Sequence, residues 1–67
     1  TGDDVLRLAQ RLELGAVNAY IGVMPSFDDR NLSQVAGRLI ADETMHWTAL
    51  TQALGGSLPT PAFSFGA

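Results

Sequence analysis

The chain has 67 residues, no cysteine, 46% hydrophobic and 16% charged residues, and a formal net charge of −3. A domain of this size buries only about 60% of its unfolded surface. No disulfide can stabilise it, so we expect the fold to depend on a bound metal, a partner chain, or both. Four basic residues give no positive patch for nucleic acid, and no apolar run reaches the roughly 18 residues of a membrane span. We therefore expect neither nucleic acid nor membrane as a partner.

Residues 4–24 are predicted to form the first helix. Thr1 and the acidic pair Asp3 and Asp4 suit its positive end. Pro25 is expected to end it, because the residue before a proline is disfavoured in helical geometry. One stripe at steps of three and four residues holds a single acid at its middle: Leu6, Ala9, Glu13, Ala16, Tyr20 and Val23. A second row predicts a second packed face: Val5, Leu8, Leu12, Gly15, Ala19 and Gly22.

A second helix is predicted over residues 32–54, after a short polar connection at residues 25–31. Asn31 and Gln34 fit a capping box at its start, and Gly55 with Gly56 fits a left-handed end. Its stripe is apolar except for two adjacent members at the middle: Leu32, Ala36, Leu39, Glu43, His46, Leu50 and Ala53. Such polar groups cost roughly 2–7 kcal/mol when buried unpaired, so the pair predicts a compensating ligand, and a metal ion suits its oxygen and nitrogen donors.

The tail at residues 57–67 is too short and too rich in proline for a third helix. Phe63 and Phe65 alternate along it. We expect this extended segment to pack along the helices or along a neighbouring chain.

The two helices are expected to form an antiparallel hairpin, because the connection between them is short. Glu13 lies fifteen residues before position 28 and Glu43 fifteen residues after it. At about 1.5 Å per residue, both carboxylates are predicted to lie about 22 Å from the turn. His46 follows one turn later. The fold class is therefore all-α, with three polar side chains meeting at one height.

One hairpin offers too few groups to enclose a pair of metal ions. Two hairpins related by a two-fold axis would supply four glutamates and two histidines to one site. Their four negative charges would balance two divalent cations. We therefore expect a homodimer, or a higher homo-oligomer, in the form of a four-helix bundle.

Glu13, Tyr20, Glu43 and His46 together resemble the ferritin-like family of di-iron carboxylate proteins. In that family, two helices each supply a Glu and the other two each supply Glu-x-x-His. Glu-x-x-His alone is common by chance, but the matched Glu and a Tyr one heptad further make the combination more specific. The resemblance covers both predicted helices and implies a ferritin-like bundle.

Two branches of that family fit the chain. Short encapsulated ferritin-like proteins have one hairpin per chain and usually carry a C-terminal peptide that docks into an encapsulin shell. Residues 58–66 do not resemble that peptide, so an encapsulin partner lacks its usual signal. In the other branch each chain has two hairpins, and residues 54–63 resemble the end of such a domain. The chain would then be half of a longer protein, or a relative that pairs with itself.

The resemblance implies iron ligands at Glu13, Glu43 and His46, with Glu43 bridging two ions per dimer. It implies that Tyr20 donates a hydrogen bond to a ligand carboxylate. Asp42 either holds the other ring nitrogen of His46 or faces water. The implied activity is oxidation of Fe(II) by dioxygen or peroxide, and zinc, manganese or calcium are the substitute metals.

Simpler interpretations exist for the same residues. His46 alone fits a hydrogen-bonded core histidine, and Glu13 fits an ion pair with Arg38 or with an arginine of a partner. Arg7 and Arg11 fit a solvated face, and Trp47 fits a packing residue. The alternative function is a structural dimerisation module of ferritin-like shape without redox activity.

Overall fold

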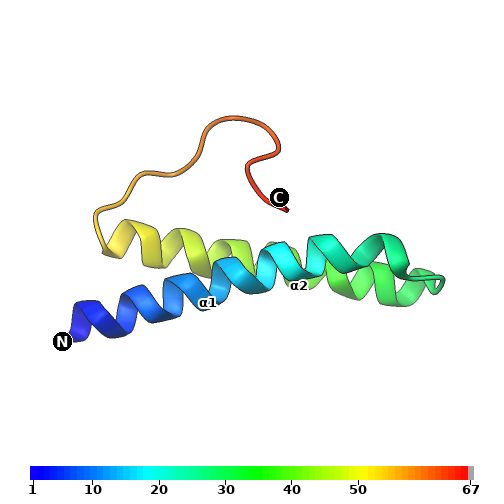
Figure 1. Ribbon diagram of the computed structural model, residues 1–67, viewed down its shortest axis with the longest axis horizontal. Helices are drawn as coiled ribbons and strands as arrows, with labels where there is room; N and C mark the ends of the chain where they lie inside the picture. Colours follow the sequence, from blue (N-terminus) through cyan, green and yellow to red (C-terminus); the bar gives the residue numbers. More distant parts are fainter. Residues whose placement is uncertain (67) are drawn as a thin grey trace.

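Two long helices form an antiparallel hairpin (Figure 1). The computed structural model describes residues 1–66: α1 spans Gly2–Val23, a short 3-10 helix η1 spans Met24–Ser26, and α2 spans Arg30–Ala53. The described chain measures 43 × 25 × 16 Å. It contains no strand, so the all-α class is confirmed for residues 1–66. Neither helix has the length and apolar character to cross a membrane.

Side-chain caps start both helices. The Thr1 hydroxyl accepts a hydrogen bond from the Asp4 amide, and the Asp4 carboxylate accepts one from the Thr1 amino group. Asp29, in an extended conformation, caps α2 by accepting from the amides of Asn31 at 2.7 Å and Leu32 at 3.3 Å. The capping box predicted at Asn31 is wrong, because Asp29 already satisfies these first free amides.

The turn and the end of α2 follow from proline and glycine. Met24 keeps helical angles of φ −52° and ψ −43°, and Pro25 continues the chain into η1. Met24 therefore stays helical before Pro25 despite the steric preference against it, and the missing N–H of Pro25 falls in the first turn of η1, where it would be unpaired. At the other end Gly55 has φ +75°. The Gly56 amide donates to the Thr51 carbonyl at 2.9 Å, which is the predicted left-handed ending.

The contact between the helices is centred beside the predicted stripes. Val17 is fully buried in α1, and Ala36, Trp47 and Thr51 are buried in α2. Of these four, only Ala36 belongs to a predicted stripe. The Gln10 amide donates to the Thr51 hydroxyl at 2.8 Å within the same contact. Val17, Trp47 and Thr51 each follow a stripe residue by one position, so three of the four buried residues lie next to the predicted stripes and not on them.

Apolar side chains remain exposed on both helices. Val5, Leu8 and Leu12 of the second row on α1 are each more than half exposed. Leu32 and Val35 of α2 are exposed to the same degree. The second packed face predicted for α1 therefore has no covering element within residues 1–66.

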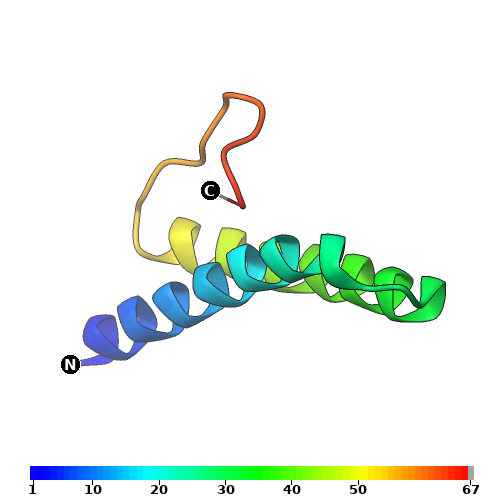
Figure 2. The same cartoon turned by 45° about the vertical axis from the view of Figure 1, so that its right-hand side comes forward.

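The tail leaves the end of α2, arches away from the hairpin and returns to it, as two views show (Figures 1 and 2). Phe65 meets the ring of Trp47 edge-on, with centroids 5.4 Å apart and planes at 86°. The Gly66 amide donates to Asn18 Oδ1 at 2.7 Å. Phe63 is 99% exposed at φ +61°, so the predicted packing is right for Phe65 and wrong for Phe63.

Gly66→Ala is predicted to release the tip of the tail. An added Cβ would lie 2.6 Å from Ile21 Cγ2, and the φ of +89° disfavours any side chain. Losing the Phe65 contact with Trp47 should cost about 1 kcal/mol of unfolding free energy and shift the Trp47 emission to the red. Gly37→Ala is the control, since its Cβ would meet nothing within 4 Å. Unchanged emission in Gly66→Ala would contradict the docked tail.

Candidate metal centre

The hairpin brings together the three polar side chains at the middle of the predicted stripes. Glu13 comes from α1, and Glu43 and His46 come from successive turns of α2. One potential ligand atom from each lies within 4.8 Å of the others. The predicted equal height of Glu13 and Glu43 is therefore confirmed. It arises because both helices rise regularly from a short turn.

Glu13 carries an oxygen with no hydrogen-bond partner. Its Oε2 atom is buried and accepts no hydrogen bond within residues 1–66. The nearest cation is the His46 ring, whose Nδ1 lies 3.5 Å away, and that ring carries charge only when protonated. A buried acceptor left unsatisfied costs about 1–3 kcal/mol, and more when it is charged. This oxygen therefore has a lone pair that is free to bind a metal ion, and it lies beside Glu43 and His46.

The two sides of the cluster differ in exposure. The Glu13 side chain is 25% exposed, whereas that of His46 is 57% exposed. Ala9 and Ala16 flank Glu13 on its face of α1, one turn to either side, and both are half-buried. The cluster is thus closed toward the inside of the hairpin and open on the side of His46.

Other residues considered from the sequence lie outside the cluster. Tyr20 is half-buried, and within residues 1–66 no hydrogen bond joins it to the three clustered side chains. Asp42 is exposed and does not belong to the group. Arg38 is exposed, and within the described chain the ionisable side chain beside Glu13 is His46, at 3.5 Å, and not Arg38. The ion pair with Arg38 is therefore not formed in this hairpin.

The three donors suit a transition-metal ion. Carboxylate oxygen and imidazole nitrogen together favour iron, manganese or zinc, whereas calcium prefers oxygen alone. The unsatisfied Glu13 oxygen supplies a lone pair that the protein leaves unused. Among residues 1–66 no other His, Asp or Glu completes the group. A metal ion thus fits the cluster, with coordination positions left over for donors from outside the chain.

A family model described as a ferritin-like domain matches residues 1–56, which include both helices and the whole cluster. The chain belongs to this ferritin-like family. No curated protein and no solved structure matches it. The resemblance inferred from the sequence is therefore confirmed, and family and cluster together point to a metal-binding role. The tail, residues 57–67, lies beyond the matched residues.

Glu13→Met is predicted to stabilise the metal-free ferritin-like hairpin. The substitution removes the unpaired oxygen and keeps a side chain of similar length, so the unfolding free energy should rise by about 1 kcal/mol. Urea denaturation followed by circular dichroism measures this change. Asp42→Asn, at an exposed neighbouring acid, should leave stability within about 0.5 kcal/mol of the parent. A clear loss of stability in Glu13→Met would show that Glu13 is satisfied in the metal-free protein.

Proposed function

We propose that two copies of the chain pair into a four-helix bundle that holds a di-metal site, with Glu13, Glu43 and His46 contributed by each copy. The observation that carries the proposal is the buried, unpaired Glu13 oxygen beside two further donors. Pairing about a two-fold axis gives four glutamates and two histidines, whose charge matches two divalent ions. The open side of the cluster is then closed by the second copy.

The exposed apolar side chains support this mode of pairing. At about 100° per residue, Val5 and Leu12 lie on the flank of α1 next to Glu13 and away from Val17. On α2, Leu32 and Val35 lie on the flank next to His46. All four are more than half exposed in the single hairpin. A second copy placed over these side chains also covers His46, so one contact buries apolar surface and completes the site.

The proposed activity is ferroxidase-like. Fe(II) ions bound at this site would be oxidised, with dioxygen or peroxide as the oxidant. The chain's own residues bind and orient: the glutamates hold the ions through oxygens that can change binding mode, and His46 offers a neutral nitrogen. Tyr20, half-buried on the Glu13 face of α1, keeps its expected role of donating a hydrogen bond to a ligand carboxylate.

Iron binding and assembly test the proposal together. We expect one Fe(II) per chain, a dimer in sedimentation equilibrium, and oxygen consumption that depends on added Fe(II). The double variant Glu43→Ala with His46→Ala should lose bound iron and oxygen consumption. Asp42→Ala, one residue from Glu43 but outside the cluster, should retain both. Two results together would favour the structural dimerisation module: the parent binds no metal, and the double variant dimerises as the parent does.

The pairing surface has a separate test. Leu12→Gln should weaken the dimer by at least about tenfold, because two partly buried leucines are lost from the interface. Met45→Gln is the matched control, since Met45 is exposed on the side of α2 opposite to α1. Sedimentation equilibrium of both variants measures the difference. Equal weakening by the two changes would place the interface elsewhere.

A further inference from the structure

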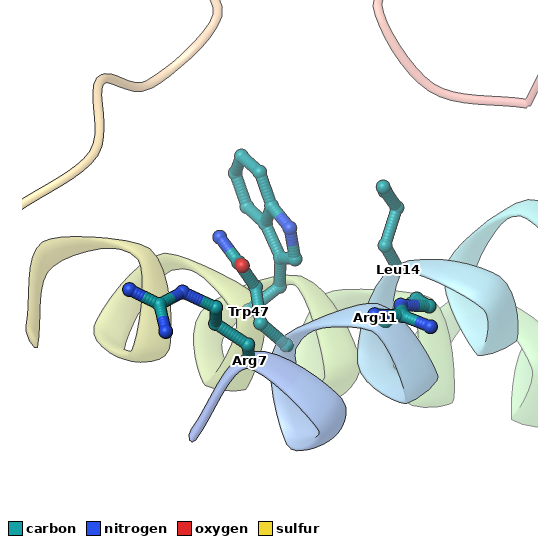
Figure 3. Close-up of a pocket in the computed structure, with 5 residues that line it drawn as sticks. Arg7, Arg11, Leu14 and Trp47 are labelled. Carbon is teal, nitrogen blue, oxygen red and sulfur yellow. The ribbon is translucent and has the colours of Figure 1, made fainter. Parts of the chain in front are cut away.

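A second concave site lies on the side of the hairpin that faces the tail. It has a volume of about 340 Å³ and is lined by Arg7, Gln10, Arg11, Leu14 and Trp47 (Figure 3). Ligand pockets span about 300–1,000 Å³, so the volume admits a small molecule. The lining includes none of the three clustered residues. Because Leu14 and Trp47 each follow a cluster residue by one position, about 100° around their helices, the pocket opens on a different face.

The apolar part of the pocket is held in place. Trp47 is only 9% exposed, and Phe65 of the tail packs against its ring. In Figure 3 the indole of Trp47 and the side chain of Leu14 both stand away from the helices toward the tail. Gln10 is fixed by its hydrogen bond to Thr51. The small part of Trp47 that stays exposed, together with Leu14, gives the pocket an apolar side that suits contact with a ring.

The polar part of the pocket is positive and has unused donors. Arg7 and Arg11 lie one turn apart on α1 and are half of the four basic residues in a chain of net charge −3. Arg7 meets only the exposed Asp4, at 3.6 Å. Within residues 1–66 Arg11 makes no ion pair, and the Trp47 indole N–H donates no hydrogen bond. A guanidinium with a free planar edge binds a carboxylate through two parallel hydrogen bonds.

We propose that this pocket binds a small aromatic or heteroaromatic carboxylate. The ring lies against Trp47 and Leu14, and the carboxylate accepts hydrogen bonds from the Arg11 guanidinium, with Arg7 adding positive charge. A cationic ligand is disfavoured by both arginines, and a neutral ring leaves Arg11 without a partner. The proposal does not depend on metal binding, because it uses other residues on another face.

Trp47 reports binding directly, since it is the only tryptophan of the chain. Metal-free protein at pH 7 is titrated with benzoate, with benzamide as a neutral ring, and with acetate as a carboxylate without a ring. We expect a saturable fluorescence change with benzoate and at least about tenfold weaker binding of the other two. Non-saturating quenching by all three probes, or equal binding of benzamide, would overturn the proposal.

Variants then assign the carboxylate contact. Arg11→Met should weaken benzoate binding by at least about tenfold, because it removes the charge and both hydrogen bonds. Arg38→Met, an exposed arginine outside the pocket, is the control and should bind as the parent does. Circular dichroism checks that Arg11→Met folds. If it folds and binds benzoate as tightly as the parent, the assignment fails.

Two further measurements separate this site from others. Inorganic sulfate that displaces benzoate at equal concentration would overturn the proposal in favour of a simple anion site. The Glu43→Ala with His46→Ala variant should bind benzoate with unchanged affinity. Because this variant removes metal ligands and no pocket residue, its benzoate binding tests the pocket separately from the metal centre.

Discussion

The candidate site of this hairpin depends on a single buried carboxylate oxygen. Within residues 1–66 no hydrogen-bond donor reaches the buried Glu13 Oε2, and the other side chains on its stripe are apolar or aromatic. Small domains have little stability in reserve, so an unsatisfied acceptor near the centre is an appreciable fraction of the total. The arrangement is explained if a ligand from outside the chain binds this oxygen. The ferritin-like family and the two neighbouring donors of α2 indicate a metal ion as that completion.

The hairpin has two unlike sides, and the difference follows from where the apolar residues stand. On one side the tail returns and covers Trp47 through Phe65. On the other side Leu12 and Val35 remain uncovered beside the cluster. A second hairpin therefore finds exposed apolar surface on one side and a docked tail on the other. The chain's own packing thus directs the proposed pairing toward the metal centre and leaves the Trp47 pocket open.

Local rules were enough to predict the elements of the fold and the height of the cluster. Helix rise is regular and the connection is short, so Glu13 and Glu43 could be matched from their distances to the turn. Start signals were less decisive, because Asp29 and Asn31 are both good caps and only backbone conformation separates them. The side-chain stripes predicted the existence of the helices well, since apolar spacing is set by the helical period.

The remaining features depend on contacts between distant parts of the chain. Trp47 lies beside the predicted stripe, and its burial depends in part on Phe65, which follows it by eighteen residues in the chain. Arg11 looked like part of a solvated face, because its only signal was its spacing from Leu14 and Arg7 along one side of α1. A pocket that combines side chains from two helices beneath a tail has no local signature. These features required the three-dimensional arrangement.

The glycine ending of α2 determines where the tail travels. Gly55 turns the chain in a left-handed step that strains any other residue, and a Cβ at Gly56 would make a tight 3.0 Å contact with Thr51 Cγ2, so both positions favour glycine. The backbone therefore leaves the line of α2 at once, arches away from the hairpin and meets it again at Phe65 and Gly66. A fluorescent label attached at the exposed Phe63 would therefore stand away from the helices and report on the protein without obstructing the surface beside Glu13.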